Sequence, residues 1–144
     1  MSKKILKKVP QWDTKLFNFL REIEQKPFKW GTWDCCIFAL QSIEVMTDKK
    51  TVAVTWKDKM SALRYIKKEG GSLKAIADKF VKQYGLETIQ KSFVTCGDIV
   101  LIKEQETQED LLGVCSGNLI LCVAEGGVTY KPNEDAKKVW RISS

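Results

Sequence analysis

Two adjacent cysteines are the residues in this sequence best suited to covalent chemistry. They end the segment WGTWDCC, residues 30–36, and apolar residues follow Cys36 at spacings of three and four. This pattern predicts a helix that begins here, with Thr32 or Asp34 as its N-cap. A thiol in the first turn of a helix lies at the positive end of the helix dipole, which lowers its pKa. Cys35 is therefore a candidate nucleophile, and Asp34 is a candidate cap or orienting group.

The residue composition restricts what these thiols can do. The sequence contains no histidine, so neither a Cys–His nor a Ser–His pair can form within the chain, and imidazole ligands for a metal are excluded. Five cysteines, at positions 35, 36, 96, 115 and 122, include no Cys-x-x-Cys spacing. We therefore predict no metal and no cofactor. For Cys35 and Cys36 we favour a packing role as small hydrophobic side chains, with residual nucleophilic or redox chemistry as the alternatives.

Hydrophobic periodicity predicts helices first and strands after them. The expected helices cover residues 13–25, 36–47, 55–69 and 73–84; Ser72 caps the last, and glycines 70–71 and 85 end the third and fourth. The third helix has a capping-box-like start at Thr55 and Asp58. The expected strands cover residues 98–103, 111–116, 119–124, 128–130 and 138–142. This order predicts a single-domain α+β fold with N-terminal helices packed on a C-terminal antiparallel sheet.

Gly117-Asn118 predicts a two-residue hairpin turn. That turn would place Cys115 opposite Ile120 and Gly113 opposite Cys122. Opposed residues point to the same face, which Leu111 shares.

Several motifs, taken in order, resemble NlpC-type peptidases, which are papain-like enzymes that cut cell-wall peptides. Residues 33–36 resemble that family's Asp-Cys-Ser helix start, residues 96–101 its Gly-Asp strand, and residues 111–118 its His-Val-Gly-Ile strand and Gly-Asn turn. The sequence is also similar to a small phage and prophage family with four short motifs. They are Trp30-Gly31, Asp34-Cys35-Cys36, Gly97-Asp98 and Trp140-Arg141.

The resemblance implies a papain-like fold, and the departure from it implies lost activity. The family's catalytic histidine corresponds to Leu111, and the region of the next polar group reads Leu121-Cys122-Val123. The resemblance implies that one face of the hairpin packs against the cysteine helix. This face contains Leu111, Cys115, Ile120 and Cys122. Packing residues would then stand where the family has its catalytic groups.

Charge and aromatic residues supply the candidate contact sites. The net charge is +6, and four lysines form a basic N-terminal arm, residues 1–10, ahead of the NlpC-like domain, residues 11–144. The simplest interpretation is that the lysines of this arm are exposed to solvent. The alternative is that the arm docks on an acidic partner or an anion. No aromatic residues are interleaved with the lysines, which argues against nucleic-acid binding. The candidate binding residues are Trp30, Trp33, Lys3, Lys4, Lys7 and Lys8.

We therefore expect a phage virion protein of the tail or tail tip, without peptidase activity, that acts through contacts with other tail proteins or in a homo-oligomeric ring. No signal peptide or membrane span is predicted, so the protein would be synthesised in the host cytoplasm and end in the virion. The alternative is a working peptidase or amidase that cuts cell-wall peptides with Cys35.

Overall fold

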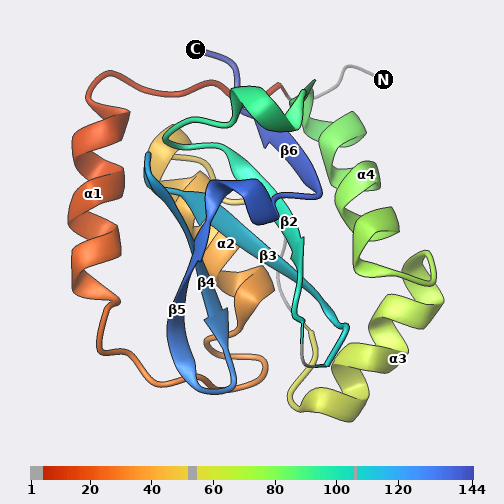
Figure 1. The fold of residues 1–144 in the computed structure, drawn as a ribbon. Helices are drawn as coiled ribbons and strands as arrows, with labels where there is room; N and C mark the ends of the chain where they lie inside the picture. The colour runs from red at the N-terminus through yellow and green to blue at the C-terminus, as the bar shows by residue number, and fades with distance from the viewer. Residues whose placement is uncertain (1–4, 52–54, 106) are drawn as a thin grey trace.

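The chain folds as four helices followed by an antiparallel sheet, which confirms the predicted α+β class (Figure 1). The computed structural model describes residues 5–51, 55–105 and 107–144. The helices are α1 (Trp12–Glu22), α2 (Cys35–Thr47), α3 (Lys59–Glu69) and α4 (Leu73–Tyr84), with short 3-10 helices η1 (Lys91–Phe93) and η2 (Asn133–Asp135). The strands are β1 (Glu87–Ile89), β2 (Ile99–Lys103), β3 (Asp110–Cys115), β4 (Leu119–Ala124), β5 (Gly127–Pro132) and β6 (Lys138–Arg141).

Local side-chain hydrogen bonds fix where α2 and α4 begin. The Asp34 carboxylate accepts the backbone N–H of Ile37 at 3.0 Å, and the Ser72 hydroxyl accepts the N–H of Ala75 at 3.1 Å. Each bond satisfies a backbone donor that the first helical turn leaves unpaired. Gly85 follows α4 in the left-handed conformation, with φ of 71°. The structure therefore selects Asp34 from the two predicted caps of α2, Thr32 and Asp34, and confirms Ser72 and Gly85 at the two ends of α4.

The predicted start of α3 was wrong by three residues, because Asp58 and not Thr55 is the N-cap. Asp58 is the N-cap, and its carboxylate accepts the N–H of Ser61 at 2.8 Å. The Ser61 hydroxyl in turn accepts the N–H of Asp58 at 3.1 Å, which completes a capping box. Thr55 has no part in this box, because the helix begins after Asp58 rather than before it. An Asp–Ser pair can form the reciprocal bonds that the more common Ser–Glu pair forms.

The strands form one sheet in the order β1-β6-β2-β3-β4-β5. The turn at Gly117 and Asn118 sets the predicted register, with Cys115 opposite Ile120 and Gly113 opposite Cys122. Strand β1 pairs with β6 at one edge and was not predicted as a separate element. Three residues are too few to show an alternating pattern in the sequence.

The two faces of the sheet bury two separate cores. Helices α1, α2 and α4 cover one face, where the strand residues that pack against α2 include Val114, Leu121 and Val123. The smaller core, on the other face, contains Val100, Ile102, Cys115, Ile120, Cys122, Ala136 and Val139. The predicted hairpin register was right, but the prediction that this face looks at the cysteine helix was wrong. Neighbouring residues of a strand point to opposite faces, so a shift of one residue exchanges the two sets.

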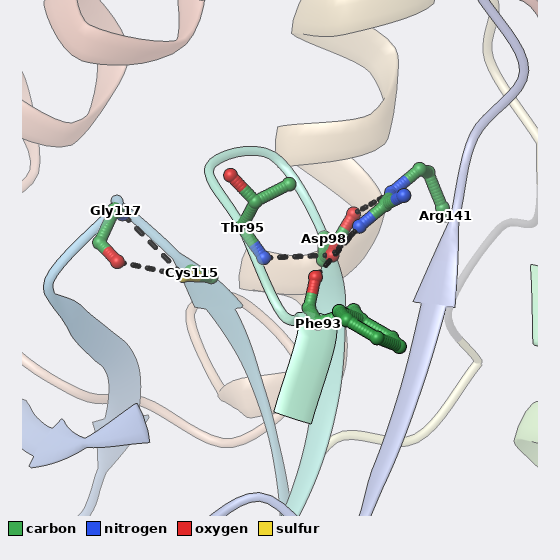
Figure 2. A network of polar contacts seen from close by, with 6 residues as sticks. All are labelled: Phe93, Thr95, Asp98, Cys115, Gly117 and Arg141. Atoms are coloured by element: carbon green, nitrogen blue, oxygen red, sulfur yellow. Dashed lines mark hydrogen bonds and ion pairs between the residues drawn. The ribbon is translucent and has the colours of Figure 1, made fainter. Parts of the chain in front are cut away.

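The Gly97-Asp98 and Trp140-Arg141 motifs meet in a buried ion pair (Figure 2). The Asp98 carboxylate is fully buried and accepts two hydrogen bonds from the Arg141 guanidinium, both at 2.9 Å. It also accepts the N–H of Thr95, and Arg141 donates to the carbonyl oxygen of Phe93. The hydrogen bond to Asp98 raises the pKa of Arg141. These contacts fasten the loop before β2 to β6, as paired bonds between arginine and carboxylate do.

Residues 5–9 are built into the folded body between α4 and the C-terminal segment. Leu6 is buried, and its N–H donates to the carbonyl of Tyr84 at 3.0 Å. The N–H of Lys8 donates to the carbonyl of Ser143 at 2.7 Å. The second half of the predicted basic arm is therefore held by backbone hydrogen bonds. None of the helices in the described ranges is long and apolar enough to cross a membrane.

Candidate functional site

The buried carboxylate of Asp34 joins three segments of the chain. Its exposure is 1%. One oxygen, Oδ1, caps α2 through Ile37, and the other, Oδ2, accepts the N–H of Gly31 at 3.0 Å and the indole N–H of Trp56 at 2.7 Å. A buried carboxylate is tolerated only when its oxygens are paired, and these three donors meet that need. Asp34 is therefore a structural cap, and both of its oxygens accept hydrogen bonds within the fold.

A close backbone approach places Trp56 beside Asp34. A Cβ atom at Gly31 would lie 2.2 Å from the carbonyl oxygen of Trp56, and Gly31 has a φ of +79°. Both facts require glycine at this position. The Trp56 ring also contacts Tyr65 of α3, with 5.1 Å between ring centroids. The loop before α2 and the segment before α3 thus meet at a single point.

Hydrogen-bond donors surround the sulfur of Cys35. The thiol of Cys36 and the backbone N–H groups of Leu112 and Cys36 all donate to it. The bond from Cys36 has the largest effect, and together these donors lower the pKa of Cys35, although burial and the Asp34 carboxylate act in the opposite direction. Donation to Cys35 and burial raise the pKa of Cys36 well above its ordinary value. The pKa of Cys35 is thus lowered, which is the direction expected for a thiol at a helix start, but the largest cause is the Cys36 thiol.

The strand residue beside Cys35 is Leu112, not the Leu111 that matches the family's histidine. Strand β3 is paired with β4 from Gly113 to Cys115 only, so β4 does not pair with Leu112. The N–H of Leu112 donates to the Cys35 sulfur instead. This donor comes from the backbone, so no side-chain pattern in the sequence could reveal it.

An apolar cavity of about 490 Å³ adjoins the two cysteines. It lies between α2, α3, α4 and residues of β2, β3 and β6. Both cysteines, Trp30 and Trp56 are among its lining residues. No pattern in the sequence indicates this cavity, because its lining residues, from Trp30 to Trp140, come together only in the folded chain.

The two tryptophans predicted as binding residues differ in exposure. Trp33 is 1% exposed and packs edge-on against Phe19 and Phe38, with ring centroids 6.2 and 5.9 Å away. Burial to this extent fits a side chain that anchors α2 in the core and not one that contacts a partner. Trp30 is half-buried, lines the cavity and contacts Phe28 edge-on.

Neither Lys7 nor Lys8, the two predicted basic residues that the structure describes, lines the cavity beside Cys35. Lys7 is exposed and pairs with Ser143 in a short bridge, while the ammonium of Lys8 lies 4.0 Å from the centre of the Trp12 ring. Burial lowers the pKa of Lys8, against the raising effect of Asp98. Lys3 and Lys4 lie outside the described residues.

In the part of the chain that the structure describes, no group of three or more histidine, cysteine or acidic side chains is arranged to hold a metal ion. All five cysteines are free thiols.

Replacement of Asp34 by alanine should destabilise the protein by about 3 kcal/mol. The change removes a helix cap and leaves the partly buried donors of Gly31 and Trp56 unpaired. Ser72→Ala is the matched control, because Ser72 caps α4 with a single bond, and it should cost about 1 kcal/mol. Urea unfolding measures both. Equal losses in the two variants would contradict the joining role of Asp34.

Alkylation by iodoacetamide should detect the acidic thiol. Because its pKa is lowered, Cys35 should react with a midpoint below that of an ordinary cysteine, about pH 8.5. Cys36→Ala removes the strongest donor, so the midpoint should rise. Cys122 is an internal control, since burial raises its pKa to about 12 and it should stay unlabelled near neutral pH. Peptide mass spectrometry across a pH series gives each midpoint; an unchanged Cys35 midpoint in Cys36→Ala would refute this assignment.

Comparison with protein families finds a match over residues 7–142. No curated protein matches the chain. The matched range includes the cysteine segment, the Gly97-Asp98 motif and the Trp140-Arg141 motif. Since the match covers nearly the whole sequence, the chain belongs to the family described as Domain of unknown function (DUF6950).

Proposed function

We propose that this chain is a catalytically inactive, NlpC-like papain-type domain that serves as a structural protein of a phage virion, in the tail or tail tip. It acts through protein–protein contacts with other tail proteins or with further copies of itself. The observation that supports the loss of activity is the set of groups around Cys35. The place in a virion rests on the motif resemblance, since a fold by itself does not define a function.

Among the described residues, the groups that lower the pKa of Cys35 stabilise a thiolate, and none of them is a general base. The groups that act on its sulfur are the Cys36 thiol, two backbone N–H groups and the Asp34 carboxylate. Of these, only Asp34 could accept a proton, and its oxygens already accept three hydrogen bonds. The chain also has no histidine to take that role.

Amide hydrolysis needs an acid as well as a nucleophile. The leaving amine must receive a proton, and a group with a pKa near the working pH transfers it best. Cys36 is the side-chain donor that contacts Cys35, and its pKa lies well above the ordinary thiol value. A thiol of that kind gives up its proton poorly at neutral pH. The geometry therefore favours a reactive thiol without turnover of amides.

One observation favours the second candidate, a working cysteine hydrolase of cell-wall peptides. The lowered pKa of Cys35 and the two N–H groups beside its sulfur are features that cysteine nucleophiles use. That candidate requires a proton donor brought by the substrate or by another chain.

The purified protein should release no peptides from peptidoglycan above the level of the Cys35→Ala variant. The reason is the missing acid and base beside the thiol. An activated aryl ester, whose leaving group needs no proton, should acylate Cys35 once without further turnover. Mass spectrometry of the protein and chromatography of released peptides measure the two reactions. Peptide release that depends on Cys35 would replace our proposal by the hydrolase.

Purified virions of the phage or prophage that encodes the chain should contain this polypeptide in fixed proportion to the other tail proteins. Quantitative mass spectrometry of virions, with tail-less particles of the same phage as the control, tests the location. Virions without the polypeptide would overturn the virion assignment and leave the inactivity of the domain a separate question.

A further inference from the structure

The two edges of the sheet differ in how well they are protected. Strand β1 forms one edge with three residues, and β5 forms the other edge with six (Figure 1). Natural proteins protect sheet edges with short strands, prolines and charged side chains, because an open edge pairs with other strands. Strand β5 has a single charged side chain, Lys131, whose ammonium lies 3.5 Å from the Glu104 carboxylate, and a single proline at its last position. The β5 edge is therefore the less protected of the two.

The hydrogen bonds of the β3–β4 hairpin show which residues of β5 face this edge. The N–H of Ser116 donates to the carbonyl of Leu119 at 2.8 Å, so Leu119 bonds toward β3. Bonding direction alternates along an antiparallel strand, so Cys122, three positions later, bonds toward β5. Cys122 is opposite Thr129, which therefore bonds toward β4. The residues on either side of Thr129 direct their N–H and C=O groups away from the sheet.

Those two residues are Val128 and Tyr130, and their outward backbone groups have no partner within the described ranges. Pro132 follows at the next outward position and has a carbonyl but no N–H. The Tyr130 side chain is 48% exposed beside this row. Backbone groups and an exposed aromatic ring in one row match an added β-strand.

A second, antiparallel copy of β5 matches these groups when the two strands meet at Thr129. In that register, Val128 lies opposite Tyr130 of the second copy, and each such pair exchanges both of its N–H···O=C bonds. The opposed side chains are then an aromatic and a β-branched residue, which is a favourable cross-strand combination. At the centre the two Thr129 side chains face each other, and Lys131 lies opposite Gly127, so no like charges meet.

The two neighbouring registers pair fewer of these groups. A shift of two residues in one direction places Pro132 opposite Val128, where the proline has no N–H to donate. A shift in the other direction places Tyr130 opposite Gly126, which belongs to the turn before β5. The sequence of β5 is thus self-complementary in one register, and this property favours a second copy of the chain over an unrelated peptide.

We propose that two copies of this chain pair through β5 about a two-fold axis at Thr129, so that their sheets join into one continuous sheet. The pairing gives a surface to the contacts between copies that the proposed function includes. Its test uses purified protein alone, so a failure here would leave the virion assignment and the inactivity of the domain untouched.

A charge exchange at Thr129 tests the pairing, because this half-buried residue faces itself across the axis. Sedimentation velocity of the full-length protein should show a dimer that dissociates on dilution. Thr129→Lys and Thr129→Glu should each weaken association about threefold to tenfold at low salt, since each places like charges opposite one another. An equal mixture of the two variants should form a heterodimer about tenfold tighter than either alone. Thr88→Lys, on the exposed β1 edge, is the matched control and should leave association unchanged.

Tyr130→Pro gives an independent test that does not change the charge. The Tyr130 N–H does not bond to β4, so proline removes a donor from each intermolecular pair and none from the hairpin. Association should weaken at least tenfold. Thermal unfolding confirms that each variant is folded. A monomer at every concentration, a dimer unaffected by Thr129→Lys and Tyr130→Pro, or a mixture without recovery would each overturn the proposal.

Discussion

The hydrogen bonds to the Asp34 carboxylate are the constraint on which this arrangement depends. Three donors from three segments converge on a side chain that water does not reach: Ile37 from α2, Gly31 from the preceding loop and Trp56 from the segment before α3. Removal of the carboxylate would leave polar groups unpaired in the interior, which costs more than a single exposed hydrogen bond. Cys35 and Cys36 are placed by this junction, since they follow Asp34 directly as the first residues of α2.

A carboxylate can either hold a fold together through hydrogen bonds or orient a catalytic partner, and the same oxygen atoms serve both roles. An acid that orients a catalytic partner needs a free oxygen directed at that partner. Both oxygens of Asp34 are used within the fold. The thiol of Cys35 therefore has hydrogen-bond donors that lower its pKa, next to a carboxylate whose two oxygens are engaged in holding the fold together.

Local features of the fold could be predicted from the sequence, and features that depend on packing could not. The caps at Asp34 and Ser72 and the register set by Gly117 and Asn118 are encoded within a few residues of where they act. The face of the hairpin was predicted wrongly, because periodicity shows which residues share a face but not which face a helix covers. The bond from Trp56 to Asp34 joins residues 22 positions apart and has no signature in either segment. The same holds for the cavity, whose walls come together only when α3 and α4 pack beside the sheet.

The hydrogen bond between Lys8 and Ser143 joins segments that lie far apart in the sequence. It holds the segment before α1 beside the segment after β6 (Figure 1). Leu6 in the first of these segments is buried and donates to the carbonyl of Tyr84. Separation of the two segments would therefore break backbone hydrogen bonds and expose an apolar side chain in a single event, so we expect them to open together and not one after the other.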